Sequence, residues 1–283
     1  MPPRSNPTAR QQRLGAELRK LREGAGLSTE QAAVLLDTKR TVITSTEAGR
    51  HGVSPERVRR IAFRYECTDQ ALVDALVAMC GDRTVGWWED YRDLLPATFL
   101  DIAELEWHAQ GLRVSTMTHM PGQLQTEAYA RALFEAAIPA LPAEEFEARV
   151  AHRMQRHQAI DKPGAPAYVV IIHEAALRIE VGGRGVLRDQ LGHLIAAADR
   201  DNVTIQAIPF SAGVFPGSGQ AILYSLGQVP PLDTVQLDRT TAGEFLHSGA
   251  HLCKYRLQLD EMQKIALPPK KTLDLMHTIS YSL

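Results

Sequence analysis

A run of hydroxyl and basic side chains between residues 28 and 50 is the part of the sequence best suited to contacting a polyanion. Seven of the nine residues from Thr38 to Thr46 are Thr, Ser, Val or Ile, and the other two are Lys39 and Arg40. A guanidinium can donate two hydrogen bonds to guanine N7 and O6, and threonine methyl groups can pack on thymine methyl groups. This chemistry suits a nucleic acid, provided that the side chains share one exposed face.

These residues are mediocre helix formers, because Thr, Val and Ile are stiff at χ1 and hydroxyls compete for backbone hydrogen bonds. Taken alone, the stretch could be a strand. Its neighbours favour a helix, since a lone strand among helices has no pairing partner. Helical apolar spacing and start signals predict four flanking helices, at Leu14-Leu18-Leu21-Ala25, Ser28-Thr29-Glu30-Gln31, Ser54-Pro55-Glu56 and Thr68-Asp69. We therefore predict a helix over 39–47, within an all-α module of five short helices.

A helix over 39–47 places Ile43 and Thr46 on its inner face, because residues three and four apart share one side. Side chains of the outer face and of the neighbouring helix ends are the candidate DNA contacts. Those at the ends are suited to phosphates, which fix the register of a protein on DNA. The candidate DNA-binding residues are Ser28, Thr29, Lys39, Arg40, Thr41, Thr44, Ser45 and Arg50.

A small residue at Ala33, a turn at Asp37 and a β-branched Ile43 have the spacing typical of a helix-turn-helix. With the flanking helices and the TEAGR ending at 46–50, residues 13–80 resemble the five-helix DNA-binding domain of the lambda/434 repressor and Cro (XRE-type) family. The resemblance implies that the helix over 39–47 enters the major groove. It also implies that Glu47 pairs with Arg19 in a structural role.

Three positions depart from that family. Asp37 replaces the common turn glycine, although Asp tolerates a left-handed backbone better than most residues. Thr46 replaces a usual Leu or Ile, so the core is less apolar. Lys39 replaces the usual capping Ser or Thr, and Thr38 is the alternative cap. A degenerate module kept only for protein contacts is the competing interpretation, and the basic and hydroxyl outer face argues against it.

Beyond residue 80, strands and helices alternate irregularly, which predicts a larger mixed α+β domain. Strands are expected near 112–119, 167–173, 203–210, 220–226 and 234–240, and helices near 97–108, 122–139, 142–160, 185–199, 249–266 and after Pro269. The predicted domains are a disordered basic arm over 1–12, the helix-turn-helix domain over 13–80, a connector over 81–96 and the α+β domain over 97–283. Trp87, Trp88 and Tyr91 are expected to pack between the domains.

The second domain offers few side chains for chemistry. His247 and His251 could share a helical face, but no third metal ligand is evident. No nucleophile motif accompanies His173, Glu174 or Asp233. The glycines of VGGRGVLRDQL lack the G-K-[ST] ending of a phosphate-binding loop. We therefore expect no enzyme activity, no metal and no cofactor.

Residues 84–283 resemble the domain of unknown activity that follows XRE-type modules in actinobacterial regulators, including the WhiJ-like proteins. The segments that carry the resemblance are WWEDYRDLLPATFLDIAELEWHA, PGQLQTEAYARA, VGG, VTIQAIPFSAG and YRLQLDEMQKIAL. Gln123 departs from the usual Leu or Ile, which puts one apolar contact in doubt. The resemblance implies a transcriptional regulator, often encoded beside a small partner protein and sometimes described as antitoxin-like.

The net charge of −2 is unevenly distributed, because residues 1–80 hold 13 Lys and Arg against 9 Asp and Glu. A basic N-terminal module is expected to meet the polyanion. The three scattered cysteines and the absence of a long apolar run favour a reducing cytoplasm and no membrane span.

We therefore expect a sequence-specific DNA-binding regulator that pairs as a homodimer on an inverted repeat. Two alternatives remain. One is an antitoxin-like module that holds a small protein encoded next to it and regulates its own expression. The other is a small-molecule sensor or cryptic enzyme in the α+β domain.

Overall fold

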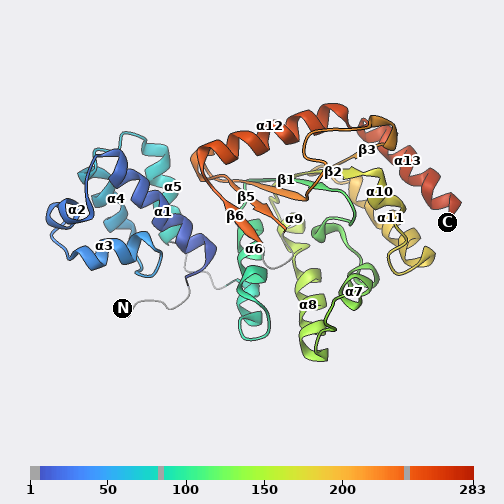
Figure 1. Ribbon diagram of the computed structural model, residues 1–283, viewed down its shortest axis with the longest axis horizontal. Helices are drawn as coiled ribbons and strands as arrows, with labels where there is room; N and C mark the ends of the chain where they lie inside the picture. Colours follow the sequence, from blue (N-terminus) through green and yellow to red (C-terminus); the bar gives the residue numbers. More distant parts are fainter. Residues whose placement is uncertain (1–6, 82–85, 239–242) are drawn as a thin grey trace. The chain divides into compact units, whose positions relative to one another are not determined.

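The computed structural model describes residues 7–81, 86–238 and 243–283. The chain forms two compact units, residues 1–86 and residues 87–283. The first is helical, and the second is a mixed sheet with helices (Figure 1). This agrees with the predicted all-α module followed by a larger α+β domain.

The first unit contains five helices, as the sequence predicts: α1 (Ala9–Gly24), α2 (Thr29–Leu35), α3 (Arg40–Glu47), α4 (Pro55–Arg64) and α5 (Gln70–Gly81). The start of α1 differs from the prediction. Thr8 and Gln11 form a capping box, so the helix begins at Ala9 rather than near Arg13. The prediction of a disordered arm was therefore wrong for residues 8–12, and residues 1–6 lie outside the described chain.

The third helix is held by its inner face despite its poor propensity. Ile43 and Thr46 are buried, as predicted, in a core with Leu18, Ile61 and Tyr65. The hydroxyl of Thr46 is buried and has no hydrogen-bond partner among the described residues. An unpaired buried hydroxyl costs free energy, so tertiary packing of the other side chains must hold this helix in place.

The first and third helices approach at van der Waals distance because α1 has a glycine at the contact. A Cβ atom at Gly15 would lie 2.5 Å from the carbonyl oxygen of Glu47 and 2.6 Å from that of Thr46. Gly49, which follows α3 with φ +73°, makes a similar approach to the backbone of Gln11. Gly15 and Gly49 therefore determine how closely α3 packs on α1.

Replacing Gly15 by Ala is expected to destabilise the first unit by about 1–3 kcal/mol, because the new methyl group must push α3 away. The measurement is urea unfolding followed by circular dichroism at 222 nm. Gly24→Ala is the matched control, since a Cβ atom at Gly24 meets nothing within 4 Å. Equal stability of the two variants would show that the contact is not tight.

The second unit is built on one six-stranded sheet with the order β3-β2-β1-β4-β5-β6. β1, β2 and β3 are parallel, and β4, β5 and β6 continue the sheet in antiparallel pairs. The strands are β1 (Gly111–Thr116), β2 (Ala167–His173), β3 (Val203–Ile208), β4 (Ile222–Leu226), β5 (Thr234–Leu237) and β6 (Glu244–Leu246). The sequence did not predict β6, which has only three residues.

Helices cover both faces of this sheet, with α12 on one face and α6, α11 and α13 on the other (Figure 1). The α-helices are α6 (Ala97–Trp107), α7 (Glu127–Glu135), α8 (Ala143–Gln155), α9 (Gln158–Asp161), α10 (Glu174–Arg178), α11 (Arg184–Ala198), α12 (Gly249–Ile265) and α13 (Pro269–Ser282). Short 3-10 turns are η1 (Trp87–Tyr91), η2 (Gly122–Leu124), η3 (Phe210–Ala212) and η4 (Pro230–Leu232).

Residues 87–96 of the predicted connector over 81–96 are part of the second unit, because η1 packs against α6 and α8, and residues 82–85 lie outside the described chain. Trp88 and Tyr91 are buried there, and the rings of Trp87 and Tyr91 surround His152 at 5.1 and 5.2 Å. Burial, with the charge of Arg156, lowers the pKa of His152 to about 3. These aromatic side chains therefore pack within the α+β unit, contrary to the predicted interdomain role.

A buried polar network explains the unexpected residue at Gln123. Its amide donates to the fully buried Glu106 at 2.5 Å and accepts from the hydroxyl of Tyr168 at 2.8 Å. Glu106 also accepts two hydrogen bonds from Arg156, at 2.9 and 2.5 Å. A polar side chain is required at position 123, because its partners are a buried carboxylate and a buried hydroxyl.

Candidate nucleic-acid interface

The turn between α2 and α3 brings the two helices together and contains one residue in the left-handed backbone conformation. Asp37 has φ +49°, as its tolerance of the left-handed region predicts. The amide of Thr38 donates to the carbonyl of Ala33 at 2.9 Å, and Ala33 itself is buried. A small residue at position 33 allows the close approach that a helix-turn-helix needs.

The predicted contact residues lie at the exposed ends and outer face of this helix pair. Thr29 and Ser45 are half-buried, whereas six side chains are exposed: Ser28, Lys39, Arg40, Thr41, Thr44 and Arg50. α3 begins after Lys39 and has no side-chain cap, so the expected cap by Thr38 is absent. The amides at the start of α3 are therefore left for solvent or a ligand.

Several hydroxyls are engaged within the helices. Ser28 caps α2 by accepting from the Gln31 amide at 3.2 Å, and the Gln31 side chain accepts from the Ser28 amide at 2.8 Å. The hydroxyl of Thr44 donates to the carbonyls of Thr41 and Arg40, at 3.2 and 3.4 Å. These bonds fix side chains on the predicted DNA-binding face.

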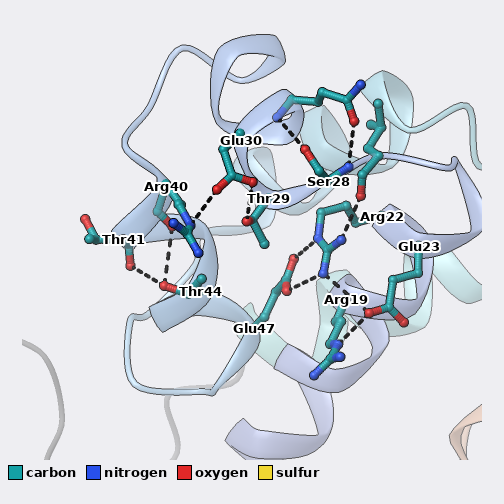
Figure 2. A network of polar contacts seen from close by, with 12 residues as sticks. Arg19, Arg22, Glu23, Ser28, Thr29, Glu30, Arg40, Thr41, Thr44 and Glu47 are labelled. Atoms are coloured by element: carbon teal, nitrogen blue, oxygen red, sulfur yellow. Dashed lines mark hydrogen bonds and ion pairs between the residues drawn. The ribbon is translucent and has the colours of Figure 1, made fainter.

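A chain of polar contacts joins the starts of the two helices (Figure 2). The Thr29 hydroxyl donates to Glu30 at 3.0 Å, and the Nε atom of Arg40 lies 2.9 Å from the other carboxylate oxygen of Glu30. Hydrogen bonds from its own backbone amide and from Thr29 lower the pKa of Glu30. Because the ion pair uses Nε, the two terminal nitrogens of Arg40 can still donate to another acceptor.

The structural partner of Glu47 is Arg22 and not Arg19, which corrects the expectation from the family resemblance. Arg22 donates to both carboxylate oxygens of Glu47, at 2.6 and 2.9 Å, and to the carbonyl of Leu27 at 2.7 Å (Figure 2). Arg19 instead pairs with Glu23 at 2.6 Å. The reason is helical phase, since Arg22 lies on the buried side of α1 and Arg19 is exposed.

The remaining candidates of the second unit have structural partners. The ring of His173 accepts from the amide of Ala175 at the start of α10, and Glu174 accepts from the amide of Phe210 at 2.9 Å. Asp233 accepts from the Tyr224 hydroxyl and from Arg256, both at 2.9 Å. Among the described residues, no group of three or more His, Cys, Asp and Glu side chains is placed to hold a metal ion.

The arrangement of α2, turn and α3 defines the class of this protein as a helix-turn-helix DNA-binding protein. The profile of a helix-turn-helix domain matches residues 13–76. The profile of a domain of unknown function, DUF5753, matches residues 99–278, and the chain belongs to the family that this domain defines.

No curated protein and no solved structure matches the chain. Across the residues that the structure describes, no helix is long and apolar enough to cross a membrane.

Two residues of the site escaped the sequence interpretation. Glu30 was considered only as part of the Ser28-Thr29-Glu30-Gln31 start signal, and only the fold shows that it contacts Arg40. Arg22 was missed because the family resemblance was carried over to Arg19, which lies three residues earlier on the exposed side of α1. Counting along the Leu14-Leu18-Leu21 stripe identifies Arg22 as the arginine nearest the buried face.

Replacing Glu30 by Gln is expected to change specificity more than affinity. The variant removes a negative charge from the predicted DNA-binding face, so binding to unrelated DNA should rise. The slope of log affinity against log salt concentration should become steeper by about one phosphate contact. Without its partner, Arg40 samples more orientations, so discrimination at the base pair that it contacts should fall severalfold. Competition binding with single-base operator variants measures this. A uniform rise in affinity at every position would contradict a positioning role for Glu30.

Proposed function

We propose that the protein is a sequence-specific DNA-binding transcriptional regulator and not an enzyme. The observation that supports this most directly is the outer face of α3, where Arg40, Thr41 and Thr44 are exposed beside Lys39. These side chains can read base edges in a major groove, which is wide enough for a helix. Thr29 and Arg50 flank this face and are suited to phosphates. The net charge of +4 over residues 1–80 favours the same partner.

Genome-wide mapping of bound DNA, followed by footprinting of purified protein on the enriched sites, tests this proposal. We expect a small set of sites that share one sequence, with protection that survives competitor DNA. Binding that depends on salt but not on sequence would contradict a specific regulator and leave only polyanion binding.

We further propose that the protein binds as a homodimer to an inverted repeat. One recognition helix covers only a few base pairs, so useful specificity requires two half-sites about one helical turn apart. Sedimentation equilibrium with and without operator DNA tests this. A monomer under both conditions would overturn the dimer.

For the second unit we propose a regulatory role in the cytoplasm, on the WhiJ-like pattern that the sequence resembles. The antitoxin-like alternative makes a different prediction. It requires a small protein encoded beside this one that co-purifies with it and changes its DNA binding.

A further inference from the structure

Arg153 and Arg156 are neighbouring arginines that differ in their hydrogen-bond acceptors: Arg156 is bound by a carboxylate and Arg153 by a neutral amide. Arg156, which follows α8, is held by both carboxylate oxygens of Glu106. Arg153, in the last turn of α8, has one hydrogen-bond partner among the described residues, the side-chain oxygen of Gln125 at 2.5 Å. Its guanidinium also lies 5.0 Å from the centre of the Phe134 ring. A guanidinium has five N–H donors, so most of those of Arg153 have no acceptor here.

A buried glutamine side chain fixes the position of the Arg153 guanidinium. Gln125 is buried, and its amide donates to the carbonyl of Met120 at 2.7 Å while its oxygen accepts from Arg153. The backbone oxygen of Gln125 lies 3.1 Å from a ring nitrogen of His157. Gln125 thus holds the guanidinium against the loop that leaves β1, beside His119.

Among the described residues, no carboxylate forms an ion pair with Arg153. Burial, together with the charge of Arg156, lowers the pKa of Arg153 to about 9, although Glu106 and Asp238 act in the opposite direction. Glu106 is already paired with Arg156, and Asp238, which accepts from Gln236 at 2.7 Å, forms no ion pair with Arg153. Arg153 is half-buried, and a half-buried cation that no described carboxylate pairs with costs free energy, which a bound anion would recover.

A second polar group near this loop is also unsatisfied. Thr116 is the last residue of β1 and is 8% exposed, and its hydroxyl has no hydrogen-bond partner among the described residues. It precedes the loop that carries His119. His119 directly precedes Met120, whose carbonyl accepts from the same Gln125 side chain that holds Arg153. Burial and the charge of Arg153 lower the pKa of His119, whereas Asp238 acts in the opposite direction.

We propose that Arg153, with His119 and Thr116 at the end of β1, binds the oxyanion of a small molecule, either a carboxylate or a phosphate. A planar guanidinium with vacant donors matches both groups, because each offers two oxygens to its fork. The site lies within the α+β unit and is independent of the DNA-binding face. It would give this unit a small anionic ligand as its effector.

The test is thermal unfolding of the full chain, followed by tryptophan fluorescence, in chloride, acetate and phosphate at equal ionic strength. All three tryptophans lie at positions 87–107, so the signal reports the second unit. Arg149→Met is the matched control for Arg153→Met. Arg149 is also on α8 with its guanidinium 5.0 Å from the Phe99 ring, but it is paired with Glu145 at 2.6 Å.

In 0.1 M acetate or phosphate, the unfolding temperature of the wild type and of Arg149→Met should rise by about 2–4 °C relative to chloride. Arg153→Met should show no rise, and in chloride it should unfold at or above the wild-type temperature. Arg153→Lys, which keeps the charge without the fork, should fold and lose most of the rise. A response to acetate alone, or to phosphate alone, identifies the class of oxyanion.

Three results would overturn the proposal. The first is no rise in the wild type, and the second is an equal rise in Arg153→Met. The third is loss of folding, or a larger fall in unfolding temperature in chloride for Arg153→Met than for Arg149→Met, because Arg153 would then be a structural residue.

Discussion

Replacing Arg40 by Ala is expected to weaken operator binding by about 1–3 kcal/mol, a loss of roughly 5- to 150-fold in affinity, while the fold stays intact. Arg40 is the first residue of α3 and is exposed, so no core contact is lost. Its terminal nitrogens remain able to donate to guanine while Nε is paired with Glu30. The loss should be concentrated at one base pair in each half-site, because the contact reads a base edge and not only a phosphate.

Footprinting and quantitative binding at fixed salt measure this effect. Arg19→Ala is the matched control, because Arg19 is an exposed arginine of the same unit that is also paired with one glutamate. The control should change operator affinity little. Equal losses for both variants would show that only net charge matters and would remove Arg40 from the reading face.

Replacing Glu106 by Leu is expected to destabilise the second unit by about 3–5 kcal/mol. The variant leaves Arg156 as a buried cation without an anion and removes an acceptor from Gln123. Although burial by itself lowers the pKa of Arg156, the charge and hydrogen bonds of Glu106 raise it overall. The Glu106 carboxylate therefore offsets the free-energy cost of burying the Arg156 guanidinium.

The measurement is urea unfolding followed by tryptophan fluorescence, which reports the second unit alone. The double variant Glu106→Leu with Arg156→Met should recover much of the loss, because an apolar pair of similar volume replaces the ion pair. A double variant as unstable as Glu106→Leu would show that the pair contributes through shape and not through charge.

The sequence alone determined the local elements of the first unit. The capping box of α2 and the apolar stripe of α1 depend only on residues within one or two turns, so spacing was enough to predict five helices. The same holds for the long helices and strands of the second unit. The short β6 could not be predicted, because three residues have no usable period and exist as a strand only by pairing with β5.

Side-chain partners across elements could not be predicted in the same way. The family resemblance offered only Arg19 as the partner of Glu47, whereas the actual partner, Arg22, depends on how α1 packs against α3, where Gly15 allows close contact. Gln123 and Glu106 are 17 residues apart, and nothing in their spacing indicates that they share a buried network.

The sequence by itself determined that residues 38–46 form a hydroxyl-rich and basic segment, and its neighbours made that segment a helix. Only the tertiary structure decided that Arg40 is paired with Glu30, that Arg22 holds Glu47, and that Arg153 has no counter-ion of its own among the described residues. The physical reason is the separation along the chain over which each interaction acts. Caps and periodicity act within a few residues of the chain, whereas ion pairing and desolvation depend on which distant segments packing brings together.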